Sequence, residues 1–473
     1  MLWYVHLTDR PCLNKHIQNV KDRNSILPEK YQVKWLPKIR FSMRTLFVLV
    51  TLLCVLLVPL SAKLYQARQQ KLAVEWVLAN GGILTYVYKS DEYGNYSRTK
   101  EPTDKQWLRS ILGNDFFDSI EFVKLKGTVK DGLSPLAHIK QLKILYLTNI
   151  EETDLSTLPQ LQDVETIRLS GKVHTDISPL IKHPKLAELY LAESTSVTDI
   201  SPLSQLSSLK RLHLNESQIP SAVSLTNLES LESISVSVKT RENLLNIKKL
   251  TCPLNLIVYE KSINDLTPLA EVSSIITLQI NWTHLDELPS FAHMKDLSDL
   301  KILSSQEITK IPPLPNTPSL NEFILTYSKV EDLQPLINQT ELKSLYLIEN
   351  QISDLSVLAN FTELTYLDLT EPNVTDISPL AKLEQLEELR MIASKVTDLK
   401  PLLNLKGIKK LALTSSKGTD FSPLYQLSTL KHLSFCDMTI SKEELNKLQM
   451  ALPNCKILAS NTNGFERSYH FRF

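Results

Sequence analysis

The chain has 473 residues, of which 42% are hydrophobic and 22% charged, as in globular proteins rather than disordered or low-complexity ones. Lys and Arg (52) balance Asp and Glu (52), so the chain lacks the overall positive field of a nucleic-acid-binding protein. The chain has only 10 glycines, which argues against a fold built around Gly-rich nucleotide-binding loops.

Residues 1–42 form a basic and aromatic N-terminal tail without clear hydrophobic periodicity. Two interpretations stay open for this tail. It is either a short cytoplasmic segment, or the result of a start codon placed too early, with Met43 as the true first residue. No function is assigned to it.

Residues 43–64 are predicted to form a transmembrane signal-anchor helix. The stretch from Thr45 to Ala62 carries no charge and would span about 27 Å as a helix, enough for the hydrocarbon core of a bilayer. Basic residues are denser before this stretch than after it, which places the N-terminus in the cytoplasm and the repeat domain outside. Leu60 makes a poor signal-peptidase site, so an uncleaved anchor is favoured over a cleaved signal peptide.

Residues 65–119 are predicted to be an α/β region that caps the front of the core. LYQARQQKLAVEWVLANGG indicates a helix that ends at Gly81-Gly82, and ILTYVY alternates like a strand. TDKQWLRSILGNDFF resembles a second short helix. A solenoid needs such a cap because its first repeat would otherwise expose apolar side chains.

Residues 120–440 consist of about fifteen units of roughly 22 residues. The units share the pattern L-x-x-L-x-L-x-x-(N/S)-x-(V/I)-(T/S)-D-(I/L)-x-P-L, most degraded over 237–262. Their leading apolar residues are Ile120, Leu142, Val164, Leu186, Leu209 and Leu231, and later Leu320, Leu342, Leu364, Leu386, Ile408 and Leu430. A repeat of this length with this consensus sequence is the signature of leucine-rich repeats.

The repeat predicts an α/β solenoid, a right-handed leucine-rich-repeat horseshoe preceded by one transmembrane helix. Each L-x-L segment is a short strand of a parallel concave sheet, with the Leu pair inward and the intervening residue facing the concave surface. Each Ser-Pro-Leu segment is a 3₁₀ or helical turn on the convex side, with Ser as N-cap. Asn350 fills the inner-turn position, where other units carry Ser217, Thr283, Ser328, Ser394 or Ser416.

Residues 441–458 are predicted to be a C-terminal capping helix and strand, followed by a flexible tail over 459–473. The helix SKEELNKLQMAL begins with Ser441 and carries Glu444 three residues later, the spacing of a capping box.

The 22-residue repeat length and the recurring T-D-I-S-P-L motif resemble those of the internalin-like class of bacterial leucine-rich repeats over residues 120–457. RFSMRTLFVLVTLL, WLRSILGNDFF and ALPNCKI also look like a bacterial family of membrane-anchored repeat proteins. The resemblance implies a curved protein-binding module at the cell envelope. The chain departs from internalin adhesins in its N-terminal anchor, and it shows no C-terminal wall-sorting signal or immunoglobulin-like domain, which argues against host adhesion.

The sequence carries no motif of an enzyme. Walker A, G-x-S-x-G, H-E-x-x-H and dinucleotide fingerprints are all missing from it, and the ten histidines are dispersed. We therefore predict no catalytic residue, no metal and no cofactor. The five cysteines are interpreted as inert thiols, with a Cys436–Cys455 bridge as the alternative.

An aspartate precedes the predicted convex turn in many of the units. Its members are Asp154, Asp176, Asp199, Asp332, Asp354, Asp376, Asp398 and Asp420. We favour a structural role, in which each carboxylate accepts backbone N–H groups of its turn. Calcium bound between successive carboxylates is the alternative.

Concave strand positions supply the candidate binding residues. The early units contribute Tyr146, Arg168, Tyr190 and His213, which we call the early band. The later units contribute Tyr346, Tyr366, Asp368 and Arg390, which we call the late band, with Glu388, Lys410 and His432 beside them. Tyr and Arg are enriched at binding hot spots, although an exposed strand also tolerates Tyr without any ligand.

Together these patterns predict a non-enzymatic interaction or scaffold module at the cell envelope that binds a protein or peptide on its concave sheet. Thr45 to Ala62 would hold it in the membrane, and no nucleic-acid partner is expected. Two alternatives stay open: a recognition subunit of a membrane-associated enzyme or secretion complex, and a glycan or cell-surface adhesin. The sequence does not identify the ligand or the oligomeric state.

Overall fold

The computed structural model describes most of residues 42–459. It leaves out 88–101, 103, 128, 130–131, 150–153, 172–175, 194–196, 215–217, 220–229, 260–262, 264, 282–284, 316–318, 393–394, 415–418 and 437–439. The tails 1–41 and 460–473 lie outside the described residues, as do four of the predicted inner-turn residues, Ser217, Thr283, Ser394 and Ser416. The chain divides into two units between Tyr65 and Gln66.

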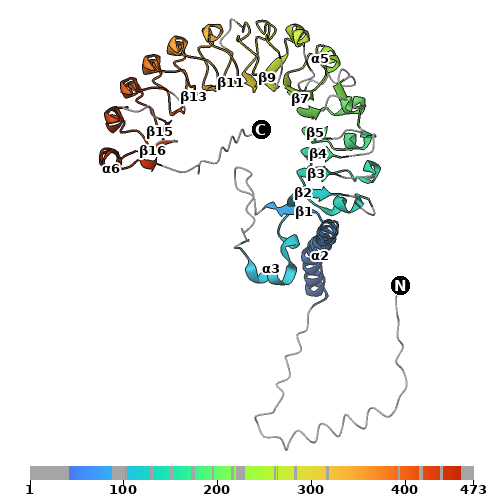
Figure 1. Ribbon diagram of the computed structural model, residues 1–473. Coiled ribbons are helices and arrows are strands. Elements are labelled where there is room, and N and C mark those ends of the chain that lie inside the picture. The colour runs from blue at the N-terminus through green and yellow to red at the C-terminus, as the bar shows by residue number, and fades with distance from the viewer. Residues whose placement is uncertain are drawn as a thin grey trace, which may run out of the picture. The chain divides into compact units, whose positions relative to one another are not determined.

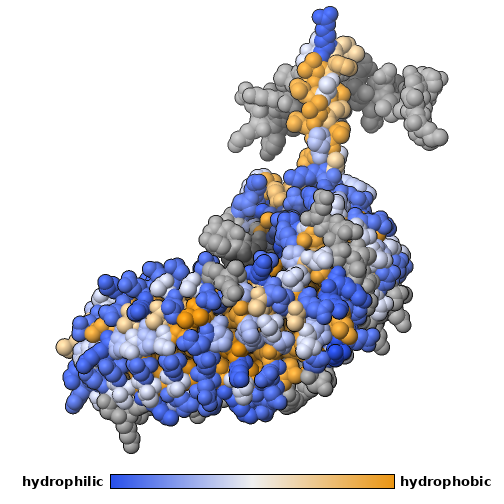
Figure 2. All heavy atoms as spheres, turned by 90° about the horizontal axis from the view of Figure 1, so that it is seen from above, coloured by the Kyte–Doolittle hydropathy of each residue, from blue (hydrophilic) through white to orange (hydrophobic). Residues whose placement is uncertain are grey.

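Helix α2 (Met43–Ala79) begins in the first unit and ends in the second. The predicted anchor and the first helix of the predicted cap are therefore one continuous helix. The helix stops before Gly81, whose positive φ of 67° takes the chain out of helical geometry. By length and composition α2 could cross a membrane, and the side chains of its apolar stretch are exposed, Phe47 by 73% and Leu56 by 70% (Figure 2).

The second unit is built around one curved sheet of 17 strands. Fifteen of them, β2 to β16, follow one another in parallel, one for each predicted repeat, and they line the inner side of the curve in Figure 1. The strands are β1 (Ile83–Tyr86), β2 (Ile120–Lys126), β3 (Ile144–Thr148), β4 (Thr166–Ser170), β5 (Glu188–Glu193), β6 (Arg211–Leu214), β7 (Ser233–Val238), β8 (Leu254–Tyr259), β9 (Ile275–Asn281), β10 (Asp299–Leu303), β11 (Glu322–Thr326), β12 (Ser344–Ile348), β13 (Tyr366–Thr370), β14 (Glu388–Met391), β15 (Lys410–Leu413), β16 (His432–Phe435) and β17 (Lys456–Ala459).

The core is one continuous column of apolar side chains behind this sheet. In each strand the two residues of the L-x-L pair are buried while the residue between them faces the concave side, as Leu345 and Leu347 do around Tyr346. Equivalent residues lie directly opposite each other in neighbouring strands, for example Leu345 and Leu367. The predicted repeat and its alternation of inward and outward residues are therefore confirmed.

Short 3₁₀ turns occupy the outer side of the curve (Figure 1). Their bounds are Ser134–His138, Leu155–Thr157, Ser178–Lys182, Ser201–Gln205, Thr267–Glu271, Gln334–Leu336, Ser356–Asn360, Ser378–Lys382, Lys400–Asn404 and Ser422–Gln426. Each places a buried Leu against the core, as Leu380 shows. The degraded region 237–262 replaces this turn with a short helix, α5 (Arg241–Ile247), which Thr240 caps.

The recurring aspartates cap these turns. The Asp376 carboxylate accepts the backbone N–H of Ser378 at 2.8 Å and its hydroxyl at 2.9 Å. The same backbone bond, at 2.8 or 2.9 Å, is made by Asp154, Asp176, Asp199, Asp265, Asp332, Asp354, Asp398 and Asp420. The prediction that Ser is the N-cap was wrong, because the Ser side chain caps nothing and Asp, two residues earlier, supplies the acceptor.

The inner turn after β12 carries a buried polar chain of three residues. The Asn350 carbonyl oxygen accepts the backbone N–H of Ser328 at 3.1 Å and its hydroxyl at 2.6 Å. The Asn350 side-chain amide donates to the Glu371 carboxylate at 2.6 Å, and its backbone N–H donates there at 3.1 Å. Burial raises the pKa of Glu371 to about 7, although these hydrogen bonds oppose the shift.

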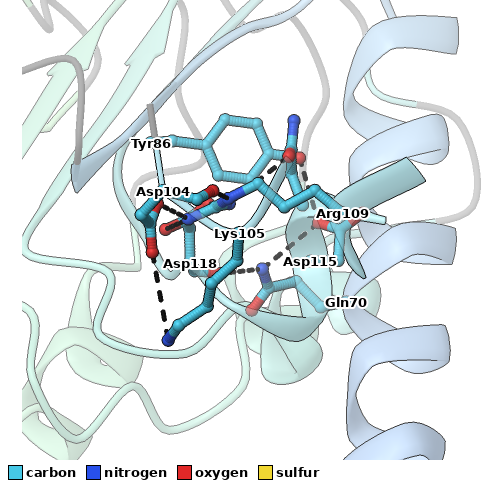
Figure 3. Close-up of polar contacts among 8 residues, drawn as sticks. Gln70, Tyr86, Asp104, Lys105, Arg109, Asp115 and Asp118 are labelled. Atoms are coloured by element: carbon cyan, nitrogen blue, oxygen red, sulfur yellow. Dashed lines mark hydrogen bonds and ion pairs between the residues drawn. The ribbon is translucent and has the colours of Figure 1, made fainter. Parts of the chain in front are cut away.

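A polar network closes the front of the solenoid (Figure 3). Gln70 of α2 donates to the backbone oxygen of Asp118 at 2.9 Å and to Asp115 at 3.2 Å, and the hydroxyl of Tyr86 in β1 donates to the same Asp115 oxygen at 3.0 Å. Arg109, from helix α3 (Gln106–Leu112), pairs with Asp118 and with Asp104, the latter at 2.7 Å. The network ties α2, β1 and α3 together, and β1 pairs antiparallel with β2.

Helix α6 (Lys442–Ala451) and strand β17 close the back. The Ser441 hydroxyl accepts the Glu444 N–H at 3.1 Å, so the predicted cap is confirmed. Glu444 does not complete the reciprocal half of a capping box, because its carboxylate accepts the hydroxyl of Tyr425. The cysteines within the described residues are free thiols, and the alternative of a Cys436–Cys455 bridge does not hold.

Candidate functional site on the concave sheet

The early band is a single column of side chains across four strands. Tyr146 on β3, Arg168 on β4, Tyr190 on β5 and His213 on β6 lie directly opposite one another in turn. Neighbouring strands of a sheet lie about 4.8 Å apart, which is close enough for each side chain to touch the next. All four are partly buried and partly open to the concave surface.

Arg168 lies between two aromatic rings in this column. Its guanidinium carbon is 5.9 Å from the centre of the Tyr146 ring and 5.5 Å from that of Tyr190. Both distances allow cation–π attraction, about 0.5–1 kcal/mol per contact at exposed sites. Lys124 of β2 lies opposite Tyr146, and Phe122, two residues earlier on β2, meets the Tyr146 ring edge to face at 5.2 Å. Arg168 also pairs with Glu193 at the rim.

Glu188 supports the other end of the column. Its Oε1 atom accepts the Tyr190 hydroxyl at 3.1 Å and the Arg211 Nε–H at 3.0 Å, and lies 3.3 Å from the Nε2 atom of His213. Burial alone would raise the pKa of Glu188, but these bonds outweigh it and the net shift is downward. Burial and the adjacent Glu188 charge raise the pKa of Tyr190 to about 12.

The late band is more buried and less continuous. The rings of Tyr346 and Tyr366 stack with their centres 4.6 Å apart and their planes at 30°. Asp368 is only 3% exposed, so it does not present its carboxylate at the surface. It accepts the hydroxyl of Thr370 at 2.7 Å and faces the Nε atom of Arg390 at 3.6 Å. Asp368 therefore positions Arg390, while Arg390 and the two tyrosines remain available to a ligand.

Electrostatics in the late band follow from this burial. Desolvation raises the pKa of Asp368, although the charge of Arg390 opposes the rise. Burial and neighbouring carboxylates raise the pKa of Tyr346 to about 12, and the pKa of Tyr366 also rises. Both phenols are therefore neutral hydrogen-bonding groups at physiological pH. Glu388 beside them is neutralised by Lys410, whose Nζ atom lies 2.9 Å away, and His432 follows on β16.

Sequence reasoning missed Phe122, Glu188 and Arg211, which hold the early band in place. Glu188 and Arg211 occupy the strand position two residues before Tyr190 and His213, and the same alternation puts them on the concave face. The alternation of inward and outward residues along each strand could therefore have identified Glu188 and Arg211 as concave residues. Among the described residues there is no cluster of three or more His, Cys, Asp or Glu side chains that could hold a metal ion.

Comparisons with known proteins agree with the repeat. A family model described as "Leucine Rich repeats (2 copies)" matches residues 340–382. A search of curated proteins finds no match to the sequence. Among solved structures, an internalin of Listeria monocytogenes is 24% identical, with 68% of this chain and 87% of that one covered and a TM-score of 0.45.

Two further solved structures are similar to the chain. A leucine-rich-repeat protein of Leptospira interrogans is 19% identical, with 68% of this chain and 91% of that one covered and a TM-score of 0.49. A plant peptide hormone receptor, solved in complex with its peptide, is 14% identical, with 71% and 64% covered and a TM-score of 0.40. The repeated sequence, the family match and the parallel sheet with its convex 3₁₀ turns lead to one conclusion: the chain carries leucine-rich repeats and folds as a leucine-rich-repeat solenoid.

Proposed function

We propose that this chain is a non-enzymatic interaction module that binds a protein or peptide on its concave sheet, chiefly through the early band. The observation that carries the proposal is the unbroken stack from Phe122 through Arg168 to His213. Its contacts link side chains of five adjacent strands, with Phe122 joining the four-residue column diagonally.

Such a stack is suited to recognition. Tyr and Arg carry much of the binding energy in protein interfaces, and their rotamers here are fixed by neighbours before any ligand arrives. A side chain that is already ordered loses little conformational entropy on binding. The Arg168 side chain keeps 35% of its surface exposed, so it can still donate hydrogen bonds to a partner.

We also propose that Thr45 to Ala62 anchors the module in a membrane, with the N-terminus in the cytoplasm and the repeats outside. The exposed apolar side chains of α2 support this, because a helix of a water-soluble domain would bury them. Extraction of membranes with alkaline carbonate tests the anchor. Retention in the pellet, with the repeats digested by protease added outside intact cells, supports it. Release into the supernatant refutes it.

The binding site is tested with two triple variants of the full chain. The first is Tyr146→Ala/Arg168→Ala/Tyr190→Ala in the early band. The matched control removes the same residue types from the late band.

The control is Tyr346→Ala/Tyr366→Ala/Arg390→Ala. Both variants and the unchanged chain are used to capture partners from detergent-solubilised envelope, and each is checked by circular dichroism and thermal melting. A partner retained by the control but lost by the first variant supports the early band. A partner retained by both, or lost only from the control, rejects that site.

A further inference from the structure

The opposite end of the sheet carries a separate feature, a basic groove beside strands β15 to β17. The groove has a volume of about 710 Å³. It is lined by Gly407, Lys409, Ser428, Thr429, Leu430, Lys431, His432, Asn454 and Lys456. No acidic side chain is among these residues, so every charged group that lines the groove is a cation or a histidine.

Charges at the entry to each strand are paired across much of the solenoid. Lys143 lies 3.2 Å from Glu121, and Lys210 lies 2.7 Å from Glu232, in each case one strand apart. This alternation cancels charge between neighbouring strands, as expected for cross-strand pairs.

The pairing is missing at the groove. Lys409 is the last member of the series with a carboxylate partner, Glu387. Lys431, just before β16, and Lys456, the first residue of β17, form no ion pair with any described carboxylate. Their backbones are adjacent, because the N–H of Lys456 donates to the carbonyl of Lys431 at 2.8 Å. Lys456 lies opposite His432 in the sheet, and both lysines line the groove, so an anion bound there would be attracted by two positive charges.

Gly407 lines the groove without a side chain of its own, whereas the positions 22 residues before and after it carry Gln385 and Thr429. A Cβ atom at Gly407 would lie 3.3 Å from the carbonyl oxygen of Glu384, so the nearest atoms on that side belong to the preceding unit. Both unpaired lysines line this same groove.

We propose that this groove binds an oxyanion carrying at least two negative charges, of the phosphate or carboxylate class, through Lys431 and Lys456. The Lys409 ammonium adds to the positive field although Glu387 holds it, and the hydroxyl of Ser428 and the amide of Asn454 are further donors on the same wall. Ammonium groups of lysine act as point charges for such anions. The proposal does not depend on the early band, which lies on β3 to β6, far along the sheet from β15 to β17.

The test uses the full chain in non-ionic detergent and measures heat on titration with pyrophosphate and, separately, with citrate. Binding is expected for pyrophosphate, with an affinity that falls as salt is raised. The citrate arm tells whether carboxylates share the site. The variant Lys431→Gln/Lys456→Gln should weaken binding by about tenfold or more, since two charge-assisted contacts are lost.

A second double variant separates the groove from net charge. Lys382→Gln/Lys395→Gln removes the same charge from exposed positions outside the groove and should keep most of the affinity. The proposal is overturned if the unchanged chain binds neither anion at millimolar concentration. It is equally overturned if the two lysine double variants lose the same affinity.

Discussion

The imidazole of His213 lies flat against the phenol ring of Tyr190, with the ring centres 3.9 Å apart and the planes 3° apart. Burial lowers the pKa of His213, and this desolvation outweighs its hydrogen bond to Glu188. The folded state therefore binds fewer protons at this site than the unfolded state does. Above about pH 6.5, the ordinary histidine pKa, the ring is neutral in both states and this site does not reduce the free energy of unfolding. As the pH falls below 6.5, the unfolded state binds the proton first and the free energy of unfolding decreases.

His213→Gln should therefore flatten part of the acid-side loss of stability. The measurement is the urea midpoint between pH 7.5 and 5, compared with the unchanged chain. NMR gives a second readout, because the His213 ring protons should be shifted upfield by Tyr190 and should move downfield in Tyr190→Leu. An unshifted His213 signal that titrates above pH 6.5 would contradict the stacked, desolvated ring.

The repeat made most of the fold predictable. Because each unit buries the same apolar positions, the framework residues fix strand register, inner and outer faces and the number of units. The Asp caps were predictable too, since Asp376 and its equivalents keep a constant two-residue offset from the turn. The predicted bonds from the turn N–H groups to these carboxylates are confirmed, and only the assignment of Ser as N-cap was wrong, because Ser-Pro alone also fits a helix start.

The contacts within the candidate site were less predictable. Glu188 and Arg211 lie 23 residues apart, as Tyr190 and His213 do, so the repeat aligns both pairs. The pattern does not show that the Glu188 carboxylate lies within hydrogen-bond distance of Tyr190, Arg211 and His213 at once. The burial of Glu371 is also not predicted by the repeat pattern. Pro372 takes the place that Asn350 holds one unit earlier, and the preceding Glu turns inward instead. Such substitutions depend on side-chain directions that a one-dimensional pattern does not contain.

Glu371 predicts a loss of stability as the pH rises from about 4.5 to about 7. Its pKa rises from 4.5 to about 7 on folding, so the native state binds more protons between these values and stability falls as the pH rises through them. The full penalty above pH 7 is about 3 kcal/mol. Glu371→Gln, which is neutral and nearly isosteric, should match the unchanged chain at pH 4.5 and have the higher urea midpoint at pH 8.

Glu363→Gln provides the control for this experiment. Glu363 is exposed in the segment that precedes β13, outside the inner turn, so its replacement removes one carboxylate without altering the buried chain. The control should keep the pH dependence of the unchanged chain. If Glu371→Gln keeps it as well, the buried carboxyl is not the group responsible.

Asp376 tests whether the aspartate series caps turns or binds calcium. Asp376→Ala removes the acceptor for the Ser378 N–H and should lower the unfolding free energy by about 1 kcal/mol, as loss of an N-cap does. Asp376→Asn keeps an oxygen acceptor and should lose less. Neither EDTA nor millimolar calcium should move the melting temperature of the unchanged chain. A calcium-dependent rise that Asp376→Ala abolishes would instead establish a cation between the units.

Gly171 follows β4 and Gly127 follows β2, at equivalent turns of their units. Replacing each by Ala distinguishes the backbone strain of a positive φ from a steric clash with the neighbouring unit. Both have positive φ, 93° and 84°, where an Ala is strained by about 1–2 kcal/mol. A Cβ atom at Gly127 would meet nothing within 4 Å, whereas at Gly171 it would lie 2.8 Å from the Cα atom of Asn149. Gly171→Ala should therefore lower the urea midpoint clearly more than Gly127→Ala, since the backbone of the neighbouring unit must also move. Equal decreases in the urea midpoint would mean that the Asn149 turn moves without destabilising the protein, and that the two units are not closely packed there.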